Sequence, residues 1–132
     1  MTTFVFDSFA ILAFFRNEAG HEAISAMLTD ISAGKGNGFI CAVNVGEVYY
    51  ITFRKQGKER AEVALNALLQ LPLEIVPADL KLSLAAAELK AIHSLSYADA
   101  FAAALTKMNN GSLVTGDKEF KALSGEIKIK FI

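Results

Sequence analysis

The chain has 132 residues, of which 53% are hydrophobic and 20% charged, a composition typical of one compact globular domain over residues 1–132. This composition excludes a disordered chain, and the length argues against several domains. The chain has thirteen basic and fourteen acidic residues, for a net charge of -1. Because this overall charge would not attract a nucleic acid, such a partner would have to be held by a local basic patch or a metal.

The single cysteine, Cys41, lies in an apolar run and has no partner for an internal disulfide, which favours a reduced, cytoplasmic setting. The apolar segment 4–15 contains Asp7, follows no cationic stretch and is shorter than the roughly 20 residues of a membrane span. It is therefore predicted to be neither an export signal nor a membrane anchor. The mean hydropathy of +0.37 is high for so small a chain, so we expect a homodimer or an obligatory partner.

The first half of the chain alternates short apolar runs with amphipathic helical patterns. In chain order, the patterns predict a strand over residues 4–6, a helix over 9–15 capped by Ser8, a helix over 21–32, a glycine-rich loop over 34–38, a strand over 39–43, a helix over 44–56 capped by Asn44, and a helix over 58–70.

The second half continues this alternation. It predicts a strand over 73–76, a helix from Asp79 to residue 92, a helix capped by Ser96 that ends at the turn 109–111, a strand over 112–115, a short helix over 118–123, and an edge strand over 127–131. Parallel neighbours need crossover connections, and short apolar strands must be covered on both sides. The sequence therefore predicts an α/β protein with a mostly parallel sheet and helices on both faces.

Four carboxylates stand at strand ends or in the first turns of helices, namely Asp7, Glu47, Asp99 and Asp117. In parallel sheets, groups that act on ligands gather outside the carboxyl ends of the strands, near the point where the strand order reverses. Each acid also has a structural explanation, because Glu47 and Asp99 complete capping-box patterns, whereas Asp7 and Asp117 suit turns or caps. Only the combination of the four acids indicates a catalytic or metal-binding site.

Carboxylates that crowd together raise each other's pKa values unless a cation shares the space. Mg²⁺ or Mn²⁺ prefers oxygen ligands and keeps positions open for a phosphate oxygen and an attacking water. The pattern argues against zinc, because His21 and His93 lie far apart and no Cys–His pairing exists. Ser8 and Ser96 have no base beside them in the sequence, which argues against a nucleophilic triad.

Four blocks around these acids resemble the acidic blocks of PIN-domain ribonucleases. The blocks are DSFAIL (7–12), VNVGEV (43–48), HSLSYADA (93–100) and LVTGDKEF (113–120). Their order and intervals resemble those of VapC-type toxins of type II toxin–antitoxin systems, and the resemblance extends from Phe4 to Ile129. Together the blocks are specific, although each alone is weak.

The resemblance implies a PIN-like three-layer fold, with a five-stranded parallel sheet in the order 3-2-1-4-5 and helices on both faces. It also implies Mg²⁺- or Mn²⁺-dependent cleavage of RNA and inhibition by a cognate antitoxin. The metal-binding acids of the family map onto Asp7, Glu47, Asp99 and Asp117, and its accompanying hydroxyl positions onto Ser8 and Thr115. As a hypothesis, three aspartates (7, 99 and 117) hold one ion directly or through water, while Glu47 completes the shell or orients the nucleophilic water.

The densest basic cluster, a candidate RNA contact, comprises Arg54, Lys55, Lys58 and Arg60. A solvated helix end explains it equally well. Tyr50, three residues after Glu47, is placed to stack on a base or to pack against its neighbours. The apolar residues in segments 9–15 and 24–28 exceed one buried stripe, so they belong to the core, a dimer contact or a groove for an amphipathic antitoxin segment.

The main alternative is a non-catalytic PIN-like interaction module, in which the acids serve as caps and the apolar surface docks a protein. A phosphoacceptor domain resembling bacterial receivers also places acids at strand ends, but the acid spacing and the absence of a strand-end lysine argue against it. A haloacid-dehalogenase-like phosphatase would need a second aspartate two residues after Asp7, where the chain has Phe9.

Overall fold

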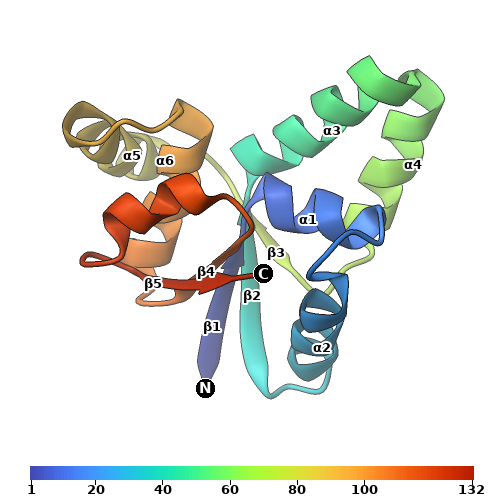
Figure 1. Cartoon of the computed structure of the whole chain (residues 1–132), viewed down its shortest axis with the longest axis horizontal. Coiled ribbons are helices and arrows are strands. Elements are labelled where there is room, and N and C mark those ends of the chain that lie inside the picture. The colour runs from blue at the N-terminus through green and yellow to red at the C-terminus, as the bar shows by residue number, and fades with distance from the viewer.

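The computed structural model describes residues 1–132 and confirms the predicted α/β fold with its five-stranded parallel sheet (Figure 1). The strands lie in the order β3-β2-β1-β4-β5, and every neighbouring pair is parallel. In chain order they are β1 (Thr2–Phe6), β2 (Gly36–Cys41), β3 (Glu74–Val76), β4 (Ser112–Thr115) and β5 (Lys128–Phe131). As its alternating lysines predict, β5 is an edge strand.

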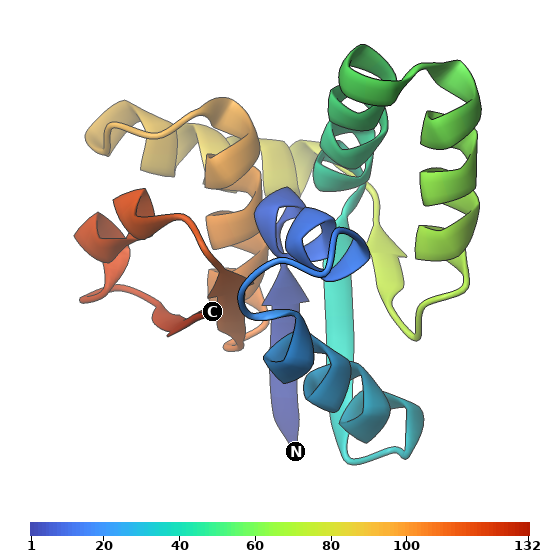
Figure 2. The ribbon, with the colours of Figure 1, turned by 45° about the vertical axis from the view of Figure 1, so that its right-hand side comes forward.

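Helices cover both faces of this sheet (Figures 1 and 2). They are α1 (Ser8–Phe15), α2 (His21–Ser32), α3 (Ala42–Gln56), α4 (Lys58–Leu69), α5 (Leu80–Ile92), α6 (Tyr97–Met108) and the 3₁₀ helix η1 (Lys118–Leu123). Helices α1 and α2 pack on one face and α5 and α6 on the other, while α3 and α4 form an antiparallel pair beyond the carboxyl ends of the strands. No helix has both the length and the apolar run that a bilayer crossing requires.

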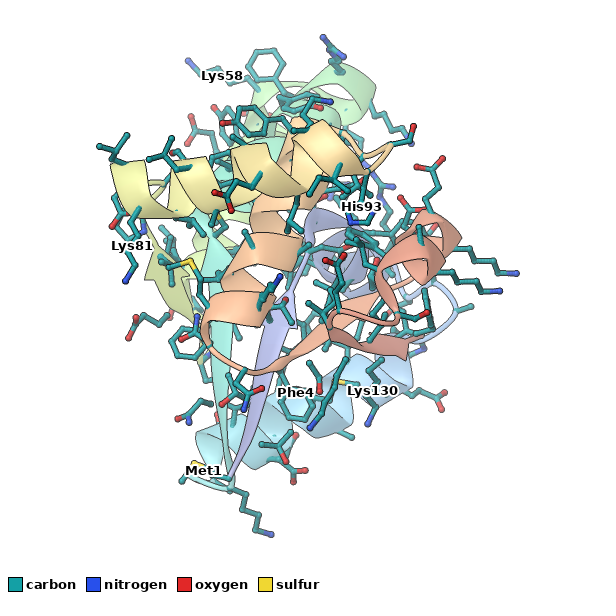
Figure 3. All side chains as sticks on the ribbon, turned by 90° about the vertical axis from the view of Figure 1, so that its left-hand side faces the viewer. Met1, Phe4, Lys58, Lys81, His93 and Lys130 are labelled. Carbon is teal, nitrogen blue, oxygen red and sulfur yellow. The ribbon has the colours of Figure 1, made fainter.

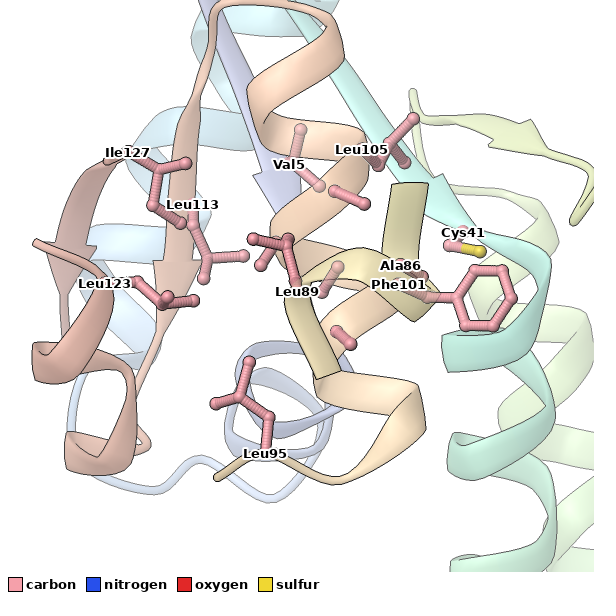
Figure 4. Close-up of a cluster of buried hydrophobic side chains, with 14 of the residues drawn as sticks. Val5, Cys41, Ala86, Leu89, Leu95, Phe101, Leu105, Leu113, Leu123 and Ile127 are labelled. Atoms are coloured by element: carbon pink, nitrogen blue, oxygen red, sulfur yellow. The ribbon is translucent and has the colours of Figure 1, made fainter. Parts of the chain in front are cut away.

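Successive side chains of β1 enter two different hydrophobic cores. Val5 belongs to the core under α5 and α6, where Figure 4 shows it near Leu105 and Leu113. Phe6 belongs to the opposite core, under α1 and α2. Both residues are fully buried, which explains why this strand has a continuous apolar run rather than an alternating pattern.

The predicted bounds of the second strand and of the helix after it were wrong. The strand covers Gly36–Cys41 instead of residues 39–43, and the helix begins at Ala42 rather than at residue 44. A Cβ atom placed on Gly38 would lie 2.6 Å from Cδ2 of Leu73 and 2.7 Å from Cδ1 of Ile31. Gly38 is therefore a close-packed strand residue and not a loop residue, because the missing side chain makes room for these neighbours.

Two predicted helix caps were also wrong. Asp7, not Ser8, caps α1, because its Oδ1 accepts a hydrogen bond of 2.8 Å from the backbone N–H of Ala10. Cys41, not Asn44, is the N-cap residue of α3, so Asn44 lies inside the first turn. The caps predicted at residues 79 and 96 are confirmed, and all other elements begin and end within two residues of their predicted positions.

Most apolar side chains of α1 and α2 are buried in the core. The buried members are Ile11, Leu12, Ile24, Met27 and Leu28. Phe14 and Phe15 are partly buried against the same core, whereas Phe9 stays 48% exposed. These residues are therefore mainly core, and Phe9 is the exception.

The sheet brings distant acidic segments to one edge. The strand order reverses at β1, which pairs with β2 on one side and with β4 on the other. Asp7 follows β1 directly, and Asp117 follows β4 after one intervening glycine. Helices α3 and α6 also begin near this edge, because the amide of Asn44 contacts the carbonyl of Ala98.

Truncation of a core residue in β1 tests this arrangement. Phe6→Ala is expected to lower the free energy of unfolding by about 3–5 kcal/mol, because it leaves a cavity between the central strand and α1. The matched control is Phe131→Ala on the edge strand, where the side chain is 41% exposed and the expected loss is about 1 kcal/mol or less. Urea denaturation measures both, and equal losses would contradict the assigned burial.

Candidate functional site

Asp7 is held between the ends of the two central strands. Its carboxylate caps α1 through Ala10, and its second oxygen, Oδ2, accepts a hydrogen bond of 2.5 Å from the hydroxyl of Thr115 at the end of β4. The same hydroxyl oxygen accepts a bond of 3.0 Å from the backbone N–H of Asp117. Asp7 is only 1% exposed, so its position is fixed by β1, α1 and β4 together.

Glu47 is fixed from two sides by neutral donors. Its Oε1 accepts hydrogen bonds from Oγ of Ser8 at 2.9 Å and from Nδ2 of Asn44 at 3.0 Å. The Asn44 amide is fully buried and also donates to the carbonyl of Ala98 at 3.3 Å, which ties α3 to α6. The other carboxylate oxygen of Glu47, Oε2, accepts no hydrogen bond from the chain and remains free for a ligand.

Three further acids come together at the start of α6 and η1. Asp99, Asp117 and Glu119 each offer one carboxylate oxygen, and these three atoms lie within 4.8 Å of one another. Ser96 caps α6 by accepting a hydrogen bond of 3.1 Å from the backbone N–H of Asp99. Asp117 caps η1 by accepting a bond of 2.9 Å from the backbone N–H of Glu119.

The sequence prediction therefore located four acids at this edge and missed Glu119. This residue stands two positions after Asp117, inside a block whose acidic character was recognised, and the spacing was the available signal. Asp117 is the N-cap of η1, and its side chain folds over the first turn to accept the backbone N–H of Glu119, where the two carboxylates lie close together.

The pKa of Asp7 is raised from its ordinary value of 3.8 to about 7, chiefly because burial penalises the charged form. The hydrogen bonds from Thr115 and Ala10 lower this pKa, and the charges of Asp99 and Glu47 raise it. An acid with such a pKa is easily protonated near neutrality unless a cation lies beside it.

The pKa of Asp99 is likewise raised from 3.8 to about 6, first by burial and next by the charge of Asp117. The hydrogen bond with Ser96 lowers this pKa, while the charges of Glu47 and Glu119 raise it further. The protonation of Asp7 and that of Asp99 are therefore coupled, because the charge of each carboxylate raises the pKa of its neighbours.

No basic side chain of the chain neutralises this cluster. The contacts between basic and acidic side chains join His21 to Glu22, and His93 and Lys107 to Glu126, and none includes a clustered acid. The donors are all carboxylate oxygens, without a histidine or a thiolate among them. Such a set fits a hard divalent cation such as Mg²⁺ or Mn²⁺ better than zinc.

The predicted basic cluster is spread over the outer part of the α3–α4 pair. Arg54 and Lys55 end α3, whereas Lys58 and Arg60 begin α4, and all four are exposed. Figure 3 shows Lys58 at the end of this pair that is remote from the sheet. Arg54 alone lies two turns after Glu47 on the same side of α3. The structure therefore brings one of the four cations toward the site and leaves the other three farther out.

Comparison with known proteins identifies this class of fold. The PIN domain family matches residues 4–126, and the chain belongs to this family. A comparison with curated protein sequences gives no match.

Solved structures of VapC and VapBC proteins have the same fold. VapBC2 from Rickettsia felis, bound to a DNA fragment from its promoter, is 19% identical with a TM-score of 0.78, and the alignment covers 99% of both chains. DNA-bound VapBC from Salmonella typhimurium is 16% identical with a TM-score of 0.75 over 98% of both chains. VapC20 from Mycobacterium tuberculosis, a sarcin-ricin loop cleaving toxin, is 20% identical with a TM-score of 0.71, over 96% of this chain and 98% of that one.

The raised pKa of Asp7 predicts how stability changes with pH when divalent ions are absent. Folded Asp7 holds its proton more tightly than the unfolded chain does, so its contribution to stability falls as the pH rises from 3.8 to about 7. Asp7→Asn removes this charge and keeps the capping oxygen. Its amide nitrogen cannot accept the hydrogen bond from Thr115, a loss that is the same at every pH. In EDTA, the stability of Asp7→Asn relative to the wild type is therefore expected to rise by on the order of 3 kcal/mol between pH 4 and pH 8.

Asp79→Asn is the matched control, because Asp79 caps α5 with the same geometry and lies outside the cluster. Asparagine caps helices as well as aspartate does, so this change is expected to leave stability almost unaltered at both pH values. Thermal unfolding from pH 4 to 8 measures all three proteins. An Asp7→Asn variant whose stability relative to the wild type does not rise between pH 4 and pH 8 would contradict an unfavourable charge at Asp7.

Proposed function

We propose that this chain is a Mg²⁺- or Mn²⁺-dependent endoribonuclease that hydrolyses phosphodiester bonds of RNA and acts as the toxin of a toxin–antitoxin pair. One observation carries the proposal: five carboxylates from four separate segments meet at one edge of the sheet, and no basic side chain balances their charge. Membership of the PIN domain family and the fold shared with VapC proteins support it.

Three aspartates would hold the ion directly or through water, namely Asp7, Asp99 and Asp117. Glu119 joins this set, because its carboxylate reaches both Asp99 and Asp117. A bound divalent ion would supply the positive charge that hydrolysis of an anionic phosphodiester requires. Thr115 would keep Asp7 oriented, since its hydroxyl already bonds the carboxylate.

Glu47 is best placed to orient the attacking water. Ser8 and Asn44 hold Oε1, so the free Oε2 can accept a proton from a water without a change of side-chain position. The oxygen of that water would form the new bond to phosphorus, while the bond from phosphorus to the leaving ribose oxygen breaks and that oxygen gains a proton from solvent. Neutral donors suit this role, since they align Glu47 without adding a competing charge.

The comparison with solved structures also supports a protein partner. Solved structures with this fold include a toxin–antitoxin complex from Klebsiella pneumoniae, so we propose that a cognate antitoxin inhibits the nuclease. Exposed apolar residues along α5 support a homodimer, namely Leu80, Leu84 and Ile92.

The free, buried thiol of Cys41 fits a cytoplasmic setting. Contacts to the RNA backbone are assigned to Arg54, Lys55, Lys58 and Arg60.

A non-catalytic PIN-like interaction module is the second candidate, and one observation favours it. Asp7 and Asp117 both cap helices, so each has a structural role without any ion. Uptake of a divalent ion separates the two candidates. A module whose acids serve only as caps has no reason to bind Mn²⁺ at this edge.

RNA cleavage tests the proposal. The purified chain is expected to cleave total RNA with Mg²⁺ or Mn²⁺ and to lose this activity in EDTA or as Asp7→Asn, because either change removes charge that the reaction needs. Asp79→Asn is the control for a lost helix-capping charge and is expected to cleave like the wild type. Sequencing of the RNA ends measures the products. Undiminished cleavage in EDTA and by Asp7→Asn would exclude this mechanism.

The fifth acid has its own test. Glu119→Gln is expected to weaken Mn²⁺ binding several-fold, but less than Asp117→Asn does, because Glu119 is the most exposed member of the cluster. Isothermal titration with Mn²⁺ measures both, and Glu74→Gln in β3 is the control for an exposed glutamate elsewhere. Identical binding by Glu119→Gln and the wild type would remove Glu119 from the site.

A further inference from the structure

His93 and Glu126 form a polar contact that lies outside the acidic cluster. Nε2 of His93 is 2.7 Å from Oε2 of Glu126, a distance at which a protonated ring nitrogen donates to a carboxylate. This nitrogen is buried and has no other polar partner. The side chains are 19% and 38% exposed, so water screens this contact less than it screens a pair on the open surface.

The contact joins the segment before Asp99 to the segment after Glu119. His93 is the C-cap residue of α5 and begins the loop that leads into α6, while Glu126 follows the end of η1. Figure 3 shows His93 beside the ribbon of η1. One of the two joined segments therefore supplies Asp99 to the site, and the other supplies Asp117 and Glu119.

Each end of the contact is fixed within its own segment. Nζ of Lys90 donates a hydrogen bond of 2.8 Å to the carbonyl of Leu95, which ties the loop before α6 to α5. The backbone N–H of Glu126 donates a bond of 2.9 Å to the carbonyl of Leu123 in η1. Leu95 and Leu123 both belong to the core under α5 and α6 (Figure 4). The contact therefore connects two locally rigid segments and not two free loops.

Glu126 makes every polar contact between these two parts of the chain. No hydrogen bond of a side chain or of the backbone joins residues 80–108 to residues 117–127. Nζ of Lys107 on α6 lies 3.9 Å from Oε1 of Glu126, but this lysine is 56% exposed and such a pair contributes little. His93 is therefore the main polar partner that holds Glu126 against the α5–α6 pair.

The acids on the same two segments repel each other. One carboxylate oxygen of Asp99 lies within 4.8 Å of an oxygen of Asp117 and of an oxygen of Glu119. Besides burial, the charges of Asp117 and Glu119 raise the pKa of Asp99. Without an ion, this repulsion favours a separation of η1 from the start of α6. An attractive contact at the far end of η1 opposes that separation.

Resting on the proposed function, we infer that the contact between His93 and Glu126 sets the distance of Asp99 from Asp117 and Glu119, so that both residues are positioning residues for the divalent ion. Neither residue belongs to the group of acids whose oxygen atoms cluster. They act by keeping α6 and η1 at the separation that an ion requires, so that less order has to be gained when the ion binds.

Isothermal titration with Mn²⁺ tests the inference in a double-mutant cycle of His93→Gln, Glu126→Gln and the two combined. Each single change is expected to weaken Mn²⁺ binding by about 3- to 10-fold, because the effect is less direct than that of a group bonded to a metal ligand. The double variant is expected to bind like either single variant, since one change already breaks the contact. Circular dichroism at the titration temperature verifies that each protein is folded, and the affinity of folded molecules does not change through a loss of stability alone.

The direction of the two changes separates positioning from a long-range charge effect. Loss of the negative charge of Glu126 disfavours a nearby cation, whereas loss of a positive charge at His93 favours it. A charge effect would therefore move the two affinities in opposite directions. Loss of positioning weakens Mn²⁺ binding in both variants.

His21→Gln and Glu22→Gln are the matched controls, because these residues form the other histidine–glutamate contact of the chain, at 3.9 Å and with more exposed side chains. Both are expected to bind Mn²⁺ like the wild type. Lys107→Gln removes the second neighbour of Glu126 and is expected to change the affinity by less than about twofold, because the pair is exposed.

The inference and the proposed function fail in different ways. Absence of Mn²⁺ binding by the wild type overturns the divalent-ion site itself. If the wild type binds Mn²⁺, unchanged affinity in both single variants overturns the inference alone, and so do opposite changes or additive losses in the double variant. If His93→Gln does not fold, Glu126→Gln compared with Glu22→Gln decides alone, and equal affinity of these two variants overturns the inference.

Discussion

Burial of like charges at one edge of the sheet is the constraint on which this site depends. Asp7 is almost fully enclosed, and this burial, with smaller contributions from the charges of Asp99 and Glu47, raises its pKa to about 7. Water would solvate these groups better than the protein does, and the fold holds them together through neutral donors only. An arrangement with this electrostatic cost is expected where a cation completes it.

Hydrogen bonds from several strands and helices hold the acids in place. Hydrogen bonds with Thr115 and Ala10 fix Asp7 to β4 and α1, while Asn44 joins Glu47 to the start of α6. Asp7 and Asp117 each cap a helix with only one carboxylate oxygen, Oδ1. Capping and ion binding are therefore compatible roles of the same carboxylate, and the helix starts place the acids without a long loop.

Sequence patterns predicted the fold well, because apolar strands and helical periodicity report burial directly. The errors fell where side chains bond across the structure. Asn44 and Ser8 look like helix caps in the sequence, but both bond Glu47, a contact that depends on how α1 and α3 meet. Glu119 was missed because the closeness of its carboxylate to Asp99 depends on how η1 and α6 meet. Gly38 looks like a loop residue until Leu73 and Ile31 are seen beside it. No local pattern encodes such long-range contacts.

The central claim is that the clustered acids form a binding site for a divalent ion. A crystal of this protein grown or soaked with Mn²⁺ tests it most directly, through the anomalous signal of the metal. We expect a peak within coordination distance of Asp99 and Asp117, with Asp7 bonded directly or through one water. Full Mn²⁺ exposure without a peak at this edge, while the five carboxylates keep their positions, would contradict it.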